Sequence, residues 1–278
     1  MSPVAKALWY IESHLTDALS LDDIAAAGGV SRFHMCRAFG EVTGRSVGQY
    51  IRGRRLSAAA RSLIGGAPDI LSAALEAGYG SLEAFTREFR DEFGRTPEQV
   101  RDEQRLETLK LVEAVTINED LTTLEPPRFL DGRTLLIGGL RAHYTVETRG
   151  GIPSQWRRFR SYLETVPERI GPVVFGVLLN CDETCGFDYV CGIEVGNFAD
   201  HPPELDRLRI PAHRYAVFRH RDRISTIRRT MSTIWNRWLP ESSCEAADAP
   251  NLERYDESFD PRTGTGGLEI WIPVTESR

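Results

Sequence analysis

Hydrophobic residues recur every three or four positions through the first hundred residues, which is the spacing of amphipathic helices. Helices are expected over 5–15 and from Ser46 to Ile64, the second ended by Gly65-Gly66. Pro97 suits the first position of a last helix, since proline fixes a helical φ and needs no donor there. This part of the chain is therefore predicted to be all helix.

Two similar patterns lie within this helical part, at 20–35 and 70–85. Each has a short apolar-periodic helix, a tight turn with glycine, and a serine (Ser31 or Ser81) that can cap a second helix. One such pattern is weak evidence, because alanine-rich helices joined by glycine are common. Two in series, 50 positions apart from Ser31 to Ser81, predict paired helix-turn-helix readers of successive major grooves.

The pattern changes after about residue 106, where a charged connector precedes runs of alternating or continuous apolar residues that are typical of strands. Strands are expected over 135–144, 173–179, 189–195, 215–220, 252–255 and 268–274. Helices are expected over 154–166 and 224–239. The order strand-helix-strand-strand occurs twice, which indicates two matched halves that form one curved antiparallel sheet with helices on its convex side.

The chain is thus predicted to be a multidomain protein. Residues 1–107 form an all-α domain with two helix-turn-helix motifs, 108–120 a linker, and 121–278 an α+β domain. Length supports this division, because 278 residues suffice for two domains with separate cores.

The charge distribution matters more than the net charge of −6. Residues 1–107 carry 13 Lys+Arg against 15 Asp+Glu, a net of −2. Within 31–61, however, seven arginines stand against one acid, Glu41. Contacts to phosphates need a local basic stripe rather than a basic protein, so this segment is expected to supply one, with a clear salt dependence of binding.

Five cysteines, unevenly placed, favour free thiols in a reducing cytoplasm over a disulfide framework. Cys181, Cys185 and Cys191 match no common zinc spacing, and neither a metal nor a cofactor is expected; redox sensing by these thiols is an open, minor alternative. Neither a transmembrane run nor a signal peptide is visible, so a cytoplasmic location without membrane contact is expected.

Two predicted strands carry an acid and an aromatic residue two positions apart, and therefore on one face of the sheet. These pairs are Glu253 with Tyr255 and Glu269 with Trp271. On the face turned away from the helices they would suit an apolar cation, since a ring face attracts the cation and the carboxylate neutralises it. The alternative is an ordinary solvated face. Glu194 is a weaker candidate acid.

The residues also resemble known families. Leu21–Leu63 and Gly78–Pro97, with the runs Val42-Thr43-Gly44, Tyr50–Leu56 and Phe93–Pro97, are similar to the AraC/XylS transcriptional regulators. The second half resembles a GyrI-like effector-binding domain. The segments that carry this second resemblance are Tyr189-Val190-Cys191, Tyr215–Phe218, Ile234-Trp235, Trp238–Pro240, Leu252–Tyr255 and Glu269–Val274.

The resemblance implies which side chains face DNA and effector. The implied DNA-binding residues are Arg32, Phe33, Cys36, Arg37, Glu83, Ala84 and Arg87. Arg32 is expected near the backbone and the others at base edges, although Cys36 and Glu83 replace an amide that relatives commonly have. The implied effector-binding residues are Tyr144, Trp156, Tyr189, Glu253, Tyr255, Glu269 and Trp271. GyrI-like domains bind lipophilic or cationic compounds, which favours the pocket over the solvated face.

The chain is therefore expected to be a one-component regulator rather than an enzyme. Its partners are promoter DNA, a small effector and RNA polymerase, and it is a monomer or a homodimer. An alternative from another class is a small-molecule hydrolase fused to a DNA-binding module, with Glu253 or Glu269 as general base. A third is a DNA-binding protein whose second domain serves only as a partner surface.

Overall fold

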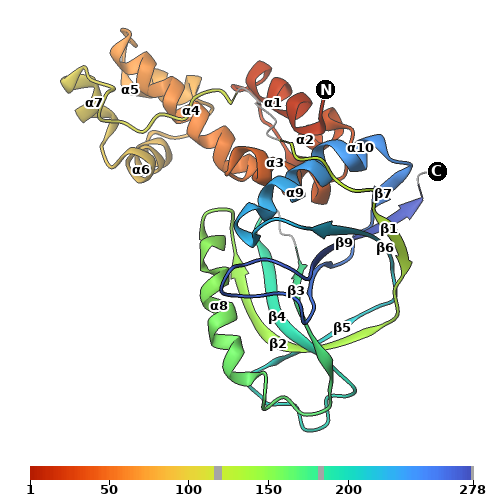
Figure 1. Ribbon diagram of the computed structural model, residues 1–278. Helices are drawn as coiled ribbons and strands as arrows, with labels where there is room; N and C mark the ends of the chain where they lie inside the picture. Colours follow the sequence, from red (N-terminus) through yellow and green to blue (C-terminus); the bar gives the residue numbers. More distant parts are fainter. Residues whose placement is uncertain (116–120, 181–184, 277–278) are drawn as a thin grey trace. The chain divides into compact units, whose positions relative to one another are not determined.

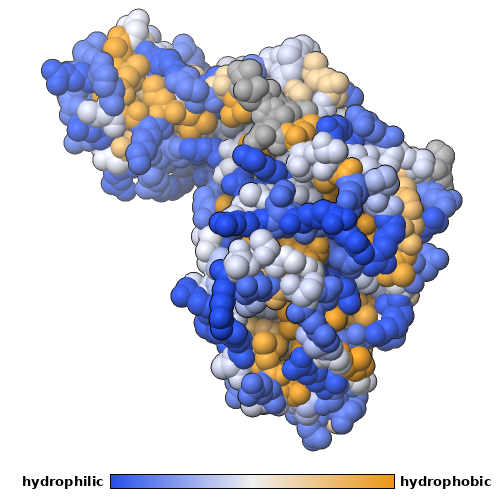
Figure 2. Space-filling model, in the orientation of Figure 1, coloured by the Kyte–Doolittle hydropathy of each residue, from blue (hydrophilic) through white to orange (hydrophobic). Residues whose placement is uncertain are grey.

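The structure is a computed structural model that describes residues 1–115, 121–180 and 185–276 (Figure 1). It consists of two compact units. The first contains Pro3–Met35 and the described residues from Arg45 onward, up to 115. The second contains Cys36–Gly44 and the described residues from 121 onward. The visible surface of both is mostly hydrophilic, with scattered hydrophobic patches (Figure 2).

The N-terminal part of the chain is helical, as its periodicity predicts. Its helices are α1 (Pro3–Ser13), α2 (Leu21–Gly28), α3 (Arg32–Thr43), α4 (Val47–Ile64), α5 (Ile70–Glu76), α6 (Leu82–Phe93) and α7 (Pro97–Glu103). The pairs α2–α3 and α5–α6 are the two predicted helix-turn-helix motifs, and α4 is the long helix between them.

Side-chain caps define where these helices begin. Ser81 Oγ accepts the backbone N–H of Ala84 at 3.2 Å, and Ser31 Oγ accepts that of His34 at the same distance. Both predicted caps are thus present, each satisfying a donor that the first helical turn leaves free. The turn before α6 contains Gly78 with φ +79°, a left-handed conformation that glycine adopts without strain.

A core of small and aromatic residues joins α4, α5, α6 and α7 in the first unit. Its buried members are Leu56, Ala59, Ala60, Leu63, Ala73, Ala74, Ala77, Phe85, Phe89, Val100 and Leu109. Alanines on α4 and α5 allow these two helices to pack closely, while Phe85 and Phe89 fill the space beneath α6. This packing leaves the opposite face of α6 exposed.

The second unit is an α+β fold built on one antiparallel sheet. Its strands are β1 (Arg128–Asp131), β2 (Leu135–Tyr144), β3 (Arg169–Leu179), β4 (Phe187–Val195), β5 (Asp206–Ile210), β6 (Arg214–His220), β7 (Cys244–Ala246), β8 (Asn251–Tyr255) and β9 (Leu268–Glu276). The strand order is β1-β6-β9-β8-β3-β4-β2-β5, and β7 pairs with β9.

Helices interrupt the strands at both places that the sequence predicts. They are α8 (Ile152–Phe159), continued by 3-10 turns at Thr148–Gly151 and Arg160–Tyr162, and α9 (Ile227–Thr233). A 3-10 turn at Ile224–Thr226 precedes α9, and a π-helical turn at Ile234–Trp238 and α10 (Leu239–Glu241) follow it. The repeated strand-helix-strand-strand order is therefore confirmed, with β1, β5 and β7 as additional short strands.

The two faces of the sheet carry different cores. One face includes Tyr189, Cys191 and Ile193 of β4 and packs against Phe159 and Trp156 of α8. Figure 1 shows α8 lying along this part of the sheet. The opposite face carries an apolar cluster supplied by strands, with no helical residue among its described members; it includes Val177, Tyr215 and Trp271.

The expectation of free cysteines is wrong for one pair. Cys36 and Cys185, both in the second unit, are joined by a disulfide with a Cα–Cα distance of 5.2 Å. They are 149 positions apart, a separation at which sequence spacing alone cannot reveal a pairing. Cys191 and Cys244 are free thiols, and Cys181 lies outside the described residues.

Candidate functional site

A carboxylate held by two tyrosine hydroxyls is the main polar feature on the α8 face of the sheet. Tyr189 OH donates to Glu253 Oε2 at 2.6 Å, and Tyr255 OH donates to the same oxygen at 2.8 Å. Trp156 Nε1 of α8 donates to Tyr189 OH at 3.1 Å, and its ring meets that of Tyr255 edge-on with centroids 5.3 Å apart. Four of the predicted effector residues therefore form one cluster, which we call the Glu253 cluster.

The other oxygen of Glu253, Oε1, accepts no hydrogen bond from the described residues, and because it is not among the buried unpaired atoms it is open to solvent. Burial raises the pKa of the Glu253 carboxyl, and the hydrogen bonds from Tyr189 and Tyr255 oppose this by favouring the charged form. The carboxylate is thus anchored through one oxygen while the second remains available; the positive charge of Arg37 also lowers its pKa, and the negative charge of Glu41 raises it.

Glycine at position 176 makes this arrangement possible. Gly176 on β3 is directly opposite Glu253 on β8. A Cβ added there would overlap the Tyr189 hydroxyl and lie 2.7 Å from Glu253 Oε2. Periodicity shows Gly176 only as part of a strand, so its contribution to the site was not predicted. Phe259 was also missed; its ring packs 4.8 Å from that of Tyr255.

The prediction that both acid–aromatic pairs share one face, turned away from the helices, is wrong. In the β8–β9 register Glu253 is opposite Ile270, while Glu269 is opposite Arg254. Residues directly opposite in a sheet point to the same face, so Glu253 and Glu269 point to opposite faces. The face that carries Glu253 is also the face covered by α8.

Glu269 is already neutralised on its own face. Arg128 Nη2 donates to both Glu269 oxygens at 2.9 and 3.0 Å, and Trp271 Nε1 donates to Oε2 at 3.1 Å. Glu194 is likewise buried and receives two hydrogen bonds from Arg133. These two acids therefore lack the open oxygen that Glu253 has.

Tyr144 lies on the same face as the Glu253 cluster, but nearer the end of β2. Its ring packs against Phe187 at 6.3 Å, and no contact with Glu253 is present in the described structure. Cys191 is fully buried on the same face, and burial raises the pKa of its thiol. A protonated, buried thiol reacts poorly, which is unfavourable for redox sensing at Cys191.

The second helix-turn-helix presents α6 with an exposed outer face. Glu83 and Arg87 are exposed, and Ala84 is half-buried beside them. Arg90, one turn beyond Arg87, is exposed as well and was missed by the sequence analysis. Leu82, at the start of α6, is 37% exposed.

Two of the acids near Arg87 in the sequence, Glu88 and Glu92, contact other residues instead of Arg87. Glu88 accepts the hydroxyl of Tyr79 at 2.8 Å and lies 3.4 Å from Arg52 of α4. Glu92 lies 3.6 Å from Arg45. Arg87 and Arg90 have no carboxylate partner within 4 Å among the described residues, so their charge remains available to a phosphate or a base.

Most arginines of the basic stripe predicted within 31–61 have partners in this structure, so less of its charge is free than a count over the segment predicts; four of the five paired arginines are largely exposed, where an ion pair is weak. The arginines of the stripe pair with acids that are distant in the chain: Arg32 with Asp22, Arg45 with Glu92, Arg52 with Glu88, Arg54 with Glu12, and Arg61 with Glu113. Arg55 instead donates to the carbonyl oxygens of Leu15 and Asp17. Counting charges in one segment missed these partners.

Arg54 is a structural residue rather than a phosphate contact. Its guanidinium donates to both oxygens of Glu12 at 2.9 and 2.7 Å and to the Val112 carbonyl oxygen at 2.9 Å. Tyr50 OH also donates to Glu12, at 2.6 Å. The Arg54 hydrogen bonds lower the pKa of the Glu12 carboxyl against the effect of burial, so this network keeps its charge and joins α1 to α4.

The first predicted reading helix, α3, begins with Arg32 and Phe33; Arg32 is exposed and Phe33 is half-buried. Cys36 and Arg37, one turn later, are only 5% and 8% exposed. The expectation that these two side chains present an open surface is therefore not met in this structure. The Cys36 side chain is also committed to the disulfide with Cys185, so the structure does not support either side chain as a base contact.

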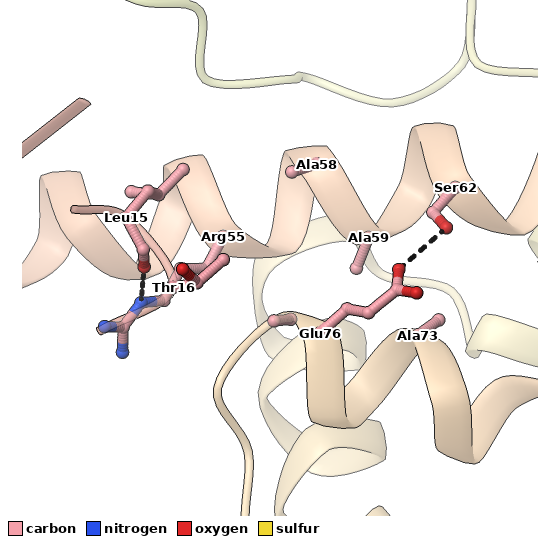
Figure 3. A pocket seen from close by; sticks show the side chains of 9 residues that line it. Leu15, Thr16, Arg55, Ala58, Ala59, Ser62, Ala73 and Glu76 are labelled. Atoms are coloured by element: carbon pink, nitrogen blue, oxygen red, sulfur yellow. Dashed lines mark hydrogen bonds between the residues drawn. The ribbon is translucent and has the colours of Figure 1, made fainter. Parts of the chain in front are cut away.

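A hollow of about 330 Å³ in the first unit, between α4, α5 and the segment after α1, is shown in Figure 3. Ala58, Ala59 and Ala73 form part of its wall. Its polar groups are already paired, since Arg55 Nε donates to the Leu15 carbonyl oxygen at 2.7 Å and Ser62 Oγ to Glu76 at 3.3 Å. Small alanine side chains explain this gap, and we assign no ligand to it.

No group of three or more His, Cys, Asp or Glu side chains among the described residues is arranged to hold a metal ion. None of their helices is long and apolar enough to cross a membrane.

Comparison with known sequences agrees with this architecture. A helix-turn-helix domain family matches residues 24–103, and the GyrI-like small molecule binding domain matches residues 126–275. The chain belongs to the AraC-type regulators that carry a GyrI-like domain. This regulator therefore binds DNA through its helix-turn-helix part and small molecules through its second part, and its family is one of transcriptional regulators rather than enzymes.

Two of the relatives match nearly the whole chain, and a third matches a third of it. Transcriptional regulator Rob of Salmonella typhimurium is 27% identical over 284 residues, covering 96% of each chain. The right origin-binding protein of Escherichia coli K12 is 25% identical, also covering 96% of each chain. Regulatory protein SoxS of Salmonella typhimurium is 39% identical over 92 residues, which are 33% of this chain and 86% of SoxS.

Among solved structures, SAV2435 bound to tetraphenylphosphonium superposes with a TM-score of 0.47 at 17% identity, covering 54% of this chain and 94% of that one.

Proposed function

We propose that this regulator senses a small organic cation, which binds at the Glu253 cluster. In this proposal, cation binding changes either the affinity of the regulator for promoter DNA or its contact with RNA polymerase. A ligand can do this only if it binds two states of the protein with different free energies.

The observation that carries the proposal is the half-buried carboxylate of Glu253, which has no ion-pair partner among the described residues. Its Oε2 accepts two tyrosine hydroxyls, and Oε1 accepts no hydrogen bond from the described residues. A half-buried carboxylate is less well solvated than an exposed one, so its charge is stabilised by a cation that binds beside it. A bound cation would compensate it, and a neutral or anionic effector would not.

The aromatic residues around the carboxylate support a cation that is also apolar. The Trp156 indole donates to the Tyr189 hydroxyl and packs edge-on against the Tyr255 ring. On Tyr255 the ring of Phe259 also packs. Aromatic rings provide apolar contact together with the electrostatic attraction of a ring face for a cation. The predicted pocket residues Glu269 and Trp271 lie on the other face, so we leave them out of the proposed site.

For the DNA-binding part we propose that α3 and α6 are the reading helices. Arg32 and Phe33 are the proposed contacts on α3, and Glu83, Ala84 and Arg87 those on α6. Cys36, which is joined to Cys185, and Arg37 are buried, so we leave these two predicted residues out of the proposed surface. Glu83 would accept from the amino group of cytosine, and Arg87 would donate to guanine or to a phosphate. The exposed Arg90 of α6 extends the same surface and is proposed as a backbone contact.

A titration of the full-length protein with tetraphenylphosphonium and other lipophilic cations, followed by tryptophan fluorescence, tests the effector site. Saturable quenching is expected, because Trp156 belongs to the cluster. Glu253→Gln should weaken binding, while Glu269→Gln serves as the matched control on the opposite face and should not. Recovery of the cation unchanged is expected for a sensor, whereas its conversion to product would indicate the hydrolase alternative. Equal binding by both variants would contradict the assignment of the site.

A further inference from the structure

The side-chain amide of Asn251 is buried without a hydrogen-bond partner. It is 1% exposed, and neither Nδ2 nor Oδ1 is bonded within the described chain. Buried polar groups are nearly always paired, because the hydrogen bonds they lose to water are otherwise not replaced. An amide with both ends unpaired therefore calls for an explanation.

The other buried amides in the described chain are at least partly satisfied. Gln155 Nε2 donates to the carbonyl oxygens of Leu140 and Tyr189 at 2.7 and 2.9 Å. Asn236 Nδ2 donates to the Ser232 carbonyl oxygen at 3.1 Å. Gln155 thus bonds to carbonyl oxygens of β2 and β4, and Asn236 to one of its own helix. Of these three amides only that of Asn251 has no hydrogen bond at either end.

The position of Asn251 relates it to the Glu253 cluster. Asn251 begins β8, two residues before Glu253, so both side chains point to the same face of the sheet. Two residues along a strand correspond to a separation of about 6.6 Å. On β3 the residue opposite Asn251 is Leu178, which belongs to the apolar cluster that also contains Tyr189. The unpaired amide thus lies on the same face of the sheet as the Glu253 carboxylate, beside this apolar cluster.

We propose that the effector is a bifunctional cation whose second polar group pairs with Asn251. This inference rests on the proposed function, because it takes the positive centre of the effector to lie at Glu253. The second group would both donate and accept hydrogen bonds, since the Asn251 amide offers an N–H donor and a carbonyl acceptor. A carboxamide, or an amino group beside a ring nitrogen, meets both requirements. A cation with only hydrocarbon substituents would leave the amide unpaired.

A matched pair of cations tests this proposal on the full-length protein. The first probe is 4-carbamoyl-N,N,N-trimethylanilinium, in which a benzene ring separates the charge from a carboxamide. The second is 4-isopropyl-N,N,N-trimethylanilinium, which has the same charge and shape with an apolar group in place of the carboxamide. Both are titrated by calorimetry against the wild type, Asn251→Leu and Glu253→Gln, with circular dichroism as the check on folding.

The carbamoyl probe is expected to bind the wild type about tenfold more tightly than the isopropyl probe. Asn251→Leu should abolish that preference, and Glu253→Gln should weaken both probes alike. Equal binding of the two probes by the wild type, or tighter binding of the isopropyl probe, would overturn the proposal even if the leucine variant does not fold. If the two probes bind equally but Glu253→Gln still weakens both, the cation site at Glu253 is supported and only the role of Asn251 is overturned. Failure of both probes to bind would overturn both the inference and the proposed function.

Discussion

The Glu253 carboxyl experiences opposing influences on its charge. Burial raises its pKa, whereas the hydroxyls of Tyr189 and Tyr255 stabilise the ionised form. The carboxyl therefore titrates closer to neutrality than an exposed glutamate. This makes its ionisation sensitive to a bound cation, since a nearby positive charge favours the carboxylate.

Cation binding should depend on pH through this group. Below the raised pKa the carboxyl is protonated and offers no counter-charge, so the apparent affinity should fall by up to about tenfold per pH unit as pH decreases. Above the pKa it should reach a plateau. Glu253→Gln should bind at least about tenfold more weakly at the plateau and show no such pH dependence. Calorimetric titration from pH 4, below the ordinary glutamate pKa of 4.5, to pH 9 measures both effects; a wild-type affinity independent of pH over this range would contradict them.

A prediction at the same scale concerns Gly176. An alanine there must displace the Tyr189 hydroxyl, because the added methyl group would occupy its position. Gly176→Ala should therefore weaken cation binding at least about tenfold while DNA binding is retained. Gly150→Ala is the matched control, since a Cβ at Gly150 meets no atom within 4 Å. Unchanged cation affinity in Gly176→Ala would show that the tyrosine–carboxylate contact is not part of the site.

At the scale of elements, hydrophobic periodicity predicted most of the fold. The spacing of capped helices identified both helix-turn-helix motifs, and β2 was predicted with its observed bounds, Leu135–Tyr144. The short strands β1, β5 and β7 were missed. In Arg128–Asp131 and Asp206–Ile210, charged residues interrupt the apolar pattern, as is common in strands at the edge of a sheet.

The site was only partly predictable, because pairing between strands is not visible in one sequence. Alternation correctly placed Glu253 with Tyr255 and Glu269 with Trp271. Which face each pair takes depends on the β8–β9 register, and a shift of one residue reverses it. The paired arginines of 31–61 illustrate the same limit, since Glu12 and Glu113 come from other parts of the chain.

The exposed face of α6 leads to a prediction about DNA binding. Arg87→Ala should weaken specific binding by about 1–3 kcal/mol and, if Arg87 contacts a base, relax the preference at that base pair. Arg95→Ala is a suitable control, because Arg95 follows α6 and is paired with Glu103. Both variants can be compared on a site selected from random DNA, at two salt concentrations. Equal affinity of Arg87→Ala and the wild type would exclude Arg87 from the reading surface.

At the scale of the whole molecule, the chain combines a DNA-binding part and a small-molecule binding part in one polypeptide. Both family matches together span most of the described residues. Regulation by an effector needs coupling between these parts, and such coupling is reciprocal: a cation that changes DNA affinity must have its own affinity changed by DNA to the same extent.

The most direct test of the account is transcription in a purified system, from a promoter that carries the selected DNA site, with and without tetraphenylphosphonium. The wild type should change its transcript level with a half-maximal response near the dissociation constant measured for the cation. Glu253→Gln should shift that response to higher concentration, and Glu269→Gln should respond like the wild type. Identical responses of the wild type and Glu253→Gln, or saturable cation binding that leaves both transcript level and DNA affinity unchanged, would contradict the claim that the Glu253 cluster senses the effector.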